Sequence, residues 1–419
     1  MSVKSMQARV NPVYLTAKTA VCLMERAKIP GAEEIACALA LDDKALLQNM
    51  KDEETILGNT LVVEAKYRTM CRLIEASGIM TSVDLPCGYT PKAIYMTEHG
   101  RKFVGLDLPI VIQEIEPIIR QLAGQAENVT FYGVDATNYS SLKAALHDVS
   151  GPLCISTEGM MMYFSDDEAD TVIANIQCLL SEYGGCWITP DPEYALQFCG
   201  TFQAVFGEES LAKLMATRDT AQGQSAVVAL GNSFIIEPTD IPASEARAEA
   251  LLARHGLKAK KINLGEHMPE LSVYKQLVPE QIVRFKEAMR HCHYWIITLD
   301  ETKGLHDTAR FMEEQPFAME YALEKGILHL SLCGRLDTIS APQLLLVWEK
   351  ANHGGNIEGI RIDCTRLKYI SSAGIRLLLE IQESCGRPLG FSGVNAKVKE
   401  ILQQNGLAEL NGGKVEQLC

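Results

Sequence analysis

No apolar run in the sequence approaches the roughly 20 residues that a helix needs to cross a bilayer. No apolar signal segment follows the opening MSVKSMQARVNPVY either. The sequence has fewer basic than acidic residues, with 39 Lys and Arg and 53 Asp and Glu, so its net charge is -14. Phosphate groups are held by clustered Lys and Arg, so this balance argues against nucleic acid or an anionic membrane as a partner. We therefore expect a soluble, cytoplasmic protein.

Paired cysteine motifs are also missing. The 13 cysteines are an odd number, and none are spaced C-x-x-C. In a long α/β chain this usage is typical of reduced, mostly buried thiols. The cluster HCHYW, residues 291–295, does not place its His and Cys side chains on one side of a strand. We therefore predict no metal site.

Strand and helix patterns alternate through most of the chain, whose 419 residues suggest two or three domains. The first 80 residues have apolar positions at helical spacing. Five strand patterns then alternate with helix patterns, which is typical of a mostly parallel, doubly wound α/β sheet. The five predicted strands are 80–85, 102–108, 129–136, 152–157 and 186–193.

The alternation of strand and helix patterns stops after the fifth predicted strand. Residues 193 to about 242 are predicted to form an insertion that serves as a lid or a pocket element. A helix with a start at Ser244 and a stop at Gly256 follows. The last two strands are predicted at 258–264 and 294–300, the second antiparallel at or near the edge of the sheet.

The last hundred residues form a second pattern. The segment 301–317 is polar and aperiodic, and we interpret it as a linker between a domain at 1–300 and a domain at 318–419. The second domain begins with a hairpin turned at Lys325 and Gly326 and continues with alternating helices and strands. This composition predicts a small, separate α/β domain.

Acidic residues follow four consecutive predicted strands. Asp84, Asp107 and Asp135 end the first three, and Glu158 follows the fourth. The carboxyl ends of parallel strands meet at one edge of an open sheet, which is where such sheets bind ligands. One such Asp is usually a helix cap, but four together favour a shared binding site.

The loop after the first strand, DLPCGYT, contains one glycine, Gly88, and a Pro86 that lacks a backbone N–H. A pyrophosphate needs several glycines around it, so this loop argues against a dinucleotide. S-adenosylmethionine carries no phosphate. It needs room for its methionine tail, a carboxylate for its ribose hydroxyls and a polar contact for its adenine. Asp107 stands roughly 20 residues after the turn, where a carboxylate meets a ribose. We therefore predict S-adenosylmethionine as the cofactor.

Four stretches of the first domain resemble the leucine carboxyl methyltransferase family. They are EAKYRTM, DLPCGYTPKAI, VGLDLP and STEGMMMYF. The resemblance covers roughly residues 5 to 300. It implies a Rossmann-like class I methyltransferase sheet that binds S-adenosylmethionine, in a group that includes O-methyltransferases acting on carboxylates and on small metabolites.

The resemblance also implies which residues bind the cofactor. Lys66 and Arg68 match a basic element that holds the cofactor carboxylate. Tyr163 is a candidate for orienting the substrate. A carboxylate acceptor needs no general base, and the candidates His267 and Asp191 are expected to be merely solvated. The full set of expected cofactor residues is Lys66, Arg68, Asp84, Pro86, Gly88, Asp107, Leu108, Asp135, Ala136, Glu158 and Gly159.

The second domain resembles the STAS domain of anti-sigma-factor antagonists, in CGRLDTISAPQL and in IDCTRLKYISSAGIRLLLEIQ. In that family a partner kinase phosphorylates a serine at a helix N-terminus, and the match falls on Ser372. The structural interpretation of Ser372 is a helix N-cap, a position that serine favours.

We therefore expect an O-methyltransferase whose acceptor is a carboxylate or a small-metabolite hydroxyl, joined to a STAS domain that docks a protein partner or kinase. The alternative is a methyltransferase fold without turnover that senses a ligand or acts as a scaffold for STAS signalling. A third hypothesis is a Rossmann-like enzyme that does not use S-adenosylmethionine.

Overall fold

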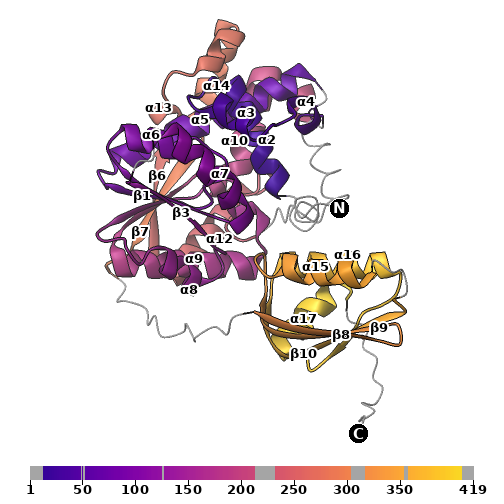
Figure 1. The fold of residues 1–419 in the computed structure, drawn as a ribbon. Helices are drawn as coiled ribbons and strands as arrows, with labels where there is room; N and C mark the ends of the chain where they lie inside the picture. Colours follow the sequence, from indigo (N-terminus) through magenta and orange to yellow (C-terminus); the bar gives the residue numbers. More distant parts are fainter. Residues whose placement is uncertain are drawn as a thin grey trace. The chain divides into compact units, whose positions relative to one another are not determined.

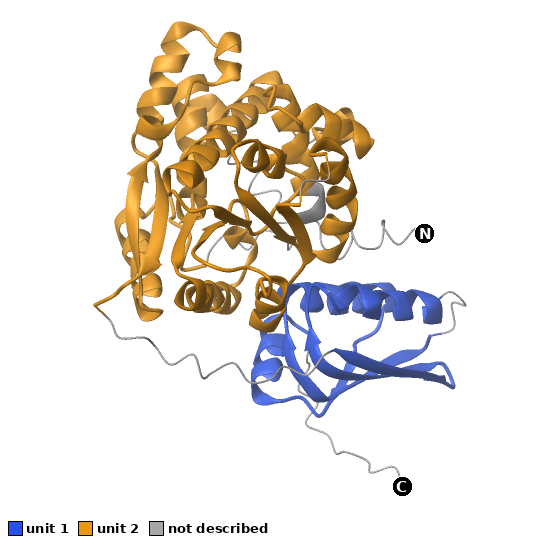
Figure 2. Cartoon of the chain, turned by 60° about the vertical axis from the view of Figure 1, so that its left-hand side comes forward, with its two compact units in different colours: residues 1–11, 312–419 blue, residues 12–311 orange. Residues whose placement is uncertain are grey.

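The computed structural model describes residues 13–48, 50, 52–124, 127–212, 232–302, 317–352 and 357–407. The chain divides into two compact units, one of residues 12–311 and one of residues 312–419 together with 1–11 (Figure 2). The predicted linker lies mostly at residues 303–316, outside the described part. Among the described helices, none combines the length and the apolar character that a membrane crossing requires.

The first unit begins with helices, as the spacing of its apolar residues predicts. They are α2 (Val13–Arg26), α3 (Ala32–Ala38), α4 (Asp43–Leu46) and α5 (Glu53–Ala76). The long helix α5 starts where the Asp52 carboxylate accepts a hydrogen bond from the Thr55 N–H, and two glutamates in its first turn face the positive end of the helix dipole. Most of the second half of α5 is buried, including Met70 and Ile74.

The centre of the first unit is a sheet of seven strands in the order β3-β2-β1-β4-β5-β7-β6. Its strands are β1 (Thr81–Asp84), β2 (Lys102–Asp107), β3 (Val129–Gly133), β4 (Leu153–Ser156), β5 (Gly185–Thr189), β6 (Leu257–Asn263) and β7 (His293–Leu299). The first five run parallel, and β7 runs antiparallel to both β5 and β6. The predicted doubly wound sheet is confirmed, and so is the antiparallel strand near its edge.

Helices cover both faces of this sheet (Figure 1). They are α6 (Lys92–Glu98), α7 (Pro109–Leu122), α8 (Tyr139–Ala145), α9 (Asp166–Tyr183) and α12 (Ile241–Arg254). Leu142, Ile176 and Leu251, from α8, α9 and α12, belong to one buried apolar cluster with strand residues such as Val83 and Ile155. These three helices therefore share one face of the sheet.

Two parts of the first unit differ from the sequence prediction. Helix α12 begins at Ile241 and not at Ser244, because the Pro residue near its start fits the first turn of a helix. The Ser244 hydroxyl instead donates to the Asp240 carbonyl and accepts from the Glu237 N–H. The helical stretch α13 (Leu264–His267), η3 (Ser272–Gln276) and α14 (Pro279–Met289) was not predicted.

The insertion after β5 contains η2 (Asp191–Glu193) and α10 (Tyr194–Phe206), and α10 packs on α5 and α14. Residues 213–231 lie outside the described part. Where the description resumes, Phe234 is fully buried and stacks on Trp187, with ring centroids 5.4 Å apart. The Phe234 ring also meets Trp295 edge-on at 6.3 Å. This end of the insertion is part of the core, and the lid remains a prediction for the rest.

The second unit has a sheet of four strands in the order β11-β10-β9-β8. Its elements are β8 (Ala318–Glu324), β9 (Ile327–Leu336), α15 (Ala341–Asn352), β10 (Gly359–Ile370), α16 (Ser372–Cys385), β11 (Gly390–Ser392) and α17 (Ala396–Gln404). The predicted hairpin is confirmed, because β8 and β9 pair antiparallel around Lys325 and Gly326. Both turn residues have positive φ, 48° and 78°, as a two-residue hairpin turn requires. The apolar residues of this unit form their own core.

Because each unit has its own buried core, we predict that a protease site inserted within residues 301–317 will release two soluble pieces after cleavage. Size-exclusion chromatography and circular dichroism of the separated pieces measure this. Precipitation or unfolding of either piece would show that the boundary is misplaced.

Candidate functional site

A buried ion pair stands at the carboxyl end of β1. Asp84 is fully buried, and its Oδ1 lies 2.7 Å from Lys92 Nζ and 2.6 Å from the donating Ser156 hydroxyl. Lys92 itself is only 2% exposed. The second oxygen, Asp84 Oδ2, is buried, and no described residue donates a hydrogen bond to it. The pair places a carboxylate oxygen with unused acceptor capacity at the ligand edge of the sheet.

The loop after β1 is tied to the end of β2. The Gly88 N–H donates to Asp107 Oδ2 at 2.7 Å, and the Leu108 N–H donates to Asp107 Oδ1 at 2.7 Å. Gly88 has a φ of 55°, and a Cβ built on it would meet only the Thr90 methyl group, at 3.9 Å. The loop also contains a cis peptide bond before Pro86. The structure thus brings Gly88, Asp107 and Leu108 together, with open space beside the glycine.

Burial raises the pKa of Asp107 to about 7. The two backbone N–H groups of Leu108 and Gly88 lower this pKa, and the nearby Asp84 carboxylate raises it, but burial has the largest effect. Asp107 therefore changes its charge close to neutral pH.

We predict that this carboxyl makes the protein less stable as the pH rises. Between the ordinary Asp pKa of 3.8 and about 7, folded Asp107 holds a proton that the unfolded chain has lost. The free energy of unfolding should therefore fall through this range and level off above it. Urea unfolding at pH 5, 6, 7 and 8 measures the slope, and Asp107→Asn should make it shallower. Equal slopes for the two proteins would contradict the prediction.

Lys66 and Glu158 join the site from α5 and from the turn after β4. Lys66 Nζ lies 3.7 Å from Glu158 Oε1 and 5.1 Å from the centre of the Tyr194 ring. Lys66 is 5% exposed, and its carbonyl accepts from the Tyr294 hydroxyl at 2.7 Å. Burial raises the pKa of Glu158, whereas the charges of Lys66 and Lys92 lower it. The two lysines therefore both act on Glu158, although they come from different helices.

Asp191 was expected to be solvated, and this expectation is wrong. It is fully buried just after β5. Its oxygens accept from the N–H groups of Gly159 at 2.6 Å, and of Met160 and Met161 at 3.0 Å. N–H groups at the start of a helix lack carbonyl partners within the helix, and here the Asp191 carboxylate accepts from them. It thereby fixes the backbone of the turn that follows Glu158. A Cβ built on Gly159 would meet no atom of the described residues within 4 Å.

The third strand is followed by a turn that the Asp135 carboxylate stabilises. Asp135 Oδ1 accepts from the Thr137 N–H at 2.8 Å and from its hydroxyl at 2.6 Å. The Ala136 carbonyl accepts from the Asn175 side chain at 2.8 Å. Both Asp135 and Ala136 are buried.

The Arg68 side chain does not lie beside the Lys66 side chain. Two positions along a helix differ by roughly 200° around its axis, so the two side chains leave α5 on different sides. Arg68 Nε donates to Glu64 Oε1 at 2.7 Å. The Arg68 side chain lines a cavity of about 360 Å³ together with Arg72 and Glu75.

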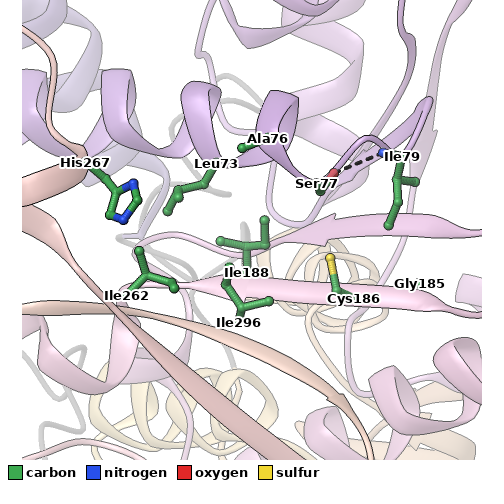
Figure 3. Close-up of a pocket in the computed structure, with 10 residues that line it drawn as sticks. All are labelled: Leu73, Ala76, Ser77, Ile79, Gly185, Cys186, Ile188, Ile262, His267 and Ile296. Atoms are coloured by element: carbon green, nitrogen blue, oxygen red, sulfur yellow. Dashed lines mark hydrogen bonds between the residues drawn. The ribbon is translucent and has the colours of Figure 1, made fainter.

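Tyr163 is partly buried in the short helix η1 (Met161–Tyr163), and burial raises the pKa of its hydroxyl. His267 lines a different cavity, of about 390 Å³, between α5 and the strands β5, β6 and β7 (Figure 3). Gly185, at the amino end of β5, lines the same cavity. This cavity is therefore not the crevice at the carboxyl ends of the strands.

The HCHYW cluster does not converge on a common point. His293 Nδ1 lies 3.1 Å from Glu193 Oε1, Cys292 is buried, and the His291 side chain is 80% exposed. Within the described ranges, no three His, Cys, Asp or Glu side chains group as metal ligands.

In the second unit the helix cap is Ser371 and not Ser372. The strand β10 ends at Ile370, and Ser371 keeps an extended backbone with a φ of -92°. Its hydroxyl accepts from the N–H groups of Ala373 and Gly374, at 3.2 and 3.3 Å. Ser372 is the first helical residue and is partly exposed.

We predict that Ser371→Ala weakens α16 and that Ser372→Ala has a smaller effect. Losing the cap costs about 1 kcal/mol. That cost is roughly a fivefold rise in the open fraction of the helix. Amide hydrogen exchange of the full chain, followed by mass spectrometry over residues 372–385, measures the change. A larger acceleration in Ser372→Ala would contradict the assignment of the cap.

The chain was also compared with known proteins. The family model described as "Mlab, STAS domain" matches residues 319–415. No curated protein matches the sequence. An O-methyltransferase family protein from Burkholderia thailandensis is 12% identical, with a TM-score of 0.33 over 60% of this chain and 61% of that one. This chain thus spans about three fifths of that protein.

Two further solved structures are similar at the same level. Magnesium protoporphyrin IX methyltransferase from Synechocystis, with bound SAH, is 11% identical, with a TM-score of 0.34 over 57% of this chain and 83% of that one. Human N-acetylserotonin methyltransferase, in complex with SAM, is 12% identical, with a TM-score of 0.31 over 66% of this chain and 68% of that one. Similarity this low establishes no activity for this chain. The STAS part of the resemblance is confirmed, and the leucine carboxyl methyltransferase subclass is not.

Proposed function

We propose that the first unit is an S-adenosylmethionine-dependent O-methyltransferase whose cofactor site lies at the carboxyl ends of β1, β2 and β4. The observation that carries this proposal is Asp84 Oδ2, a buried carboxylate oxygen that accepts no hydrogen bond from the part of the chain that the structure describes. A buried polar atom of this kind is costly unless a ligand or water satisfies it. It stands at the ligand edge of the sheet, beside the loop of Gly88.

The residues present fit the chemical groups of this cofactor. The ammonium of the methionine tail needs a carboxylate, which Asp84 and Glu158 offer. The carboxylate of the tail needs a cation, and Lys66 Nζ lies only 3.7 Å from Glu158 Oε1. The ribose hydroxyls need an acceptor, which Asp107 supplies at the end of β2. A Cβ-sized group beside Gly88 or Gly159 would meet no close atom of the described residues, so a ligand atom could approach the backbone at both turns.

When bound, the cofactor would supply an electrophilic methyl group, and the work of the protein would be alignment. The Asp191 carboxylate holds the turn of Glu158, and the Asp107 carboxylate holds the loop of Gly88. The proposed methyl acceptor is a carboxylate, which needs no general base, or a small-metabolite hydroxyl, which Tyr163 would orient. The single-glycine loop disfavours the alternative of a dinucleotide enzyme. Among the described residues, none favours a methyltransferase fold without turnover over an active enzyme.

Two assays test this proposal. Native mass spectrometry of the protein purified without added cofactor should show bound S-adenosylmethionine or S-adenosylhomocysteine. Incubation with S-adenosylmethionine and a library of small carboxylic acids should then release S-adenosylhomocysteine. Failure to retain either ligand, even after incubation with millimolar S-adenosylmethionine, would overturn the proposal. Retention without turnover would favour the ligand-sensing alternative.

We further propose that the STAS domain docks a protein partner and that Ser372 is its phosphorylation site. The partly exposed Ser372 stands at the first position of α16, where a phosphate would lie at the positive end of the helix dipole. Phosphopeptide mapping of protein from its own cells, before and after phosphatase treatment, tests the site.

A further inference from the structure

Two buried cysteines stand side by side in the middle of the large sheet. Cys154 of β4 and Cys186 of β5 are direct register partners in parallel strands. Register partners on neighbouring strands project from the same face of a sheet. The two sulfur atoms lie 4.0 Å apart, with the Cys186 thiol donating to Cys154 Sγ. Cys154 is fully buried, and Cys186 is 7% exposed.

The backbone already has the spacing that a disulfide requires. Neighbouring strands lie about 4.8 Å apart. This spacing falls within the range of about 4.4 to 6.8 Å that separates the Cα atoms of bonded cysteines. The sulfur atoms would approach from 4.0 Å by side-chain rotation, without a movement of either strand.

Cys186 also has access to small molecules. It lines the cavity of about 390 Å³, whose wall otherwise consists mainly of Ile and Leu side chains. Its sulfur points from β5 toward the side of the cavity where Ser77 and Ile79 lie (Figure 3). A small, neutral molecule fits a space of this size, since one water needs only about 10–15 Å³ of such volume.

The surroundings of the pair favour the thiolate of one member, Cys186. When Cys186 ionises, the neighbouring Cys154 thiol donates to it, and this hydrogen bond lowers the pKa of Cys186. The same interaction, together with burial, raises the pKa of Cys154, although the Arg101 guanidinium acts in the opposite direction. Arg101 is itself buried, with its Nη2 donating to the Glu75 carbonyl at 2.8 Å. A thiolate, and not a thiol, is the reactive form of cysteine.

We propose that Cys154 and Cys186 form a modification site, at which hydrogen peroxide oxidises the pair to an intramolecular disulfide. The Cys186 thiolate attacks one peroxide oxygen, the O–O bond breaks, and hydroxide leaves, which gives a sulfenic acid. Cys154 sulfur then attacks Cys186 sulfur, the S–O bond breaks, and the hydroxyl leaves as water with the proton of Cys154. Two thiols are oxidised, one peroxide is reduced, and two waters form.

Peroxide titration of the full chain tests the proposal. After each dose, free thiols are alkylated in denaturant, and the digest is searched for the peptide pair that carries Cys154 and Cys186. We expect this crosslink to form at lower peroxide doses than those that oxidise the exposed Cys37 and to disappear after dithiothreitol treatment. Oxidation of Cys37 with both Cys154 and Cys186 still alkylated would overturn the proposal.

Variants separate the two steps. In Cys154→Ser, the sulfenic acid of Cys186 should persist and be trapped by dimedone, because its partner is gone. In Cys186→Ser, Cys154 should stay reduced. The control is Cys364→Ser, which replaces a buried cysteine of the other unit and should form the crosslink as the unmodified chain does. Circular dichroism checks that each variant is folded. Trapping at Cys154 in Cys186→Ser would show that the assignment of the attacking thiol is wrong.

Discussion

Lys92→Met is expected to lower the free energy of unfolding of the first unit by about 3–5 kcal/mol, the usual cost of removing one member of a buried ion pair. Lys92 is 2% exposed and lies 2.7 Å from Asp84, which is fully buried. Without the lysine, the hydrogen bond from Ser156 on the same oxygen is the one that described side chains still offer to the Asp84 carboxylate. The carboxylate must then stay charged in an apolar surrounding or take up a proton. Urea unfolding at pH 8 measures the loss.

Two controls isolate the effect of the pair. Lys143→Met breaks an exposed pair with Glu182 and should cost no more than about 1 kcal/mol. The double variant with Lys92→Met and Asp84→Asn should recover part of the loss, because no unpaired charge remains. If Lys92→Met costs no more than Lys143→Met, the pair does not hold the site together.

Asp107→Ala is expected to weaken the binding of S-adenosylhomocysteine at least 100-fold. The variant removes the acceptor for the ribose hydroxyls and also the anchor of the Gly88 N–H. Each hydrogen bond to a charged group contributes about 1.5–3 kcal/mol. Two of them correspond to a loss of about 100-fold or more, at 1.4 kcal/mol for each factor of ten. The ligand-induced rise in melting temperature should disappear in the variant.

The matched control is Asp148→Ala, whose side chain is 76% exposed and lies outside the site. This variant should bind the ligand as the unmodified chain does. A similar affinity in Asp107→Ala would show that the ligand, if it binds, does not contact the end of β2.

The sequence predicts the carboxyl edge of the sheet well, for a physical reason. Apolar runs bounded by turns define the parallel strands, and parallel strands end at one edge. Asp84, Asp107, Asp135 and Glu158 could therefore be placed at one edge of the sheet without knowledge of any contact. The same rule applies to Asp191 after β5. The residue type alone does not indicate its burial, because an Asp in a loop is usually solvated.

Other features depend on the tertiary structure. Lysines are mostly exposed and are almost never fully buried unless they are paired. The sequence TPKAI therefore gives no sign that Lys92 is buried and contacts Asp84. Their contact requires the loop that returns the start of α6 to β1. The choice between Ser371 and Ser372 as the cap depends on where β10 ends, a boundary that strand patterns predict only to within a few residues. The burial of Phe234 depends on Trp187 and Trp295, from two strands far apart in the sequence.

Isothermal titration calorimetry of the full chain with S-adenosylhomocysteine, at pH 8, tests the proposed cofactor site most directly. Because Asp107 is ionised there and both turns leave space for the ligand, we expect one molecule to bind per chain, with an affinity that falls as the pH drops below about 7. No heat of binding at millimolar ligand would contradict the methyltransferase assignment.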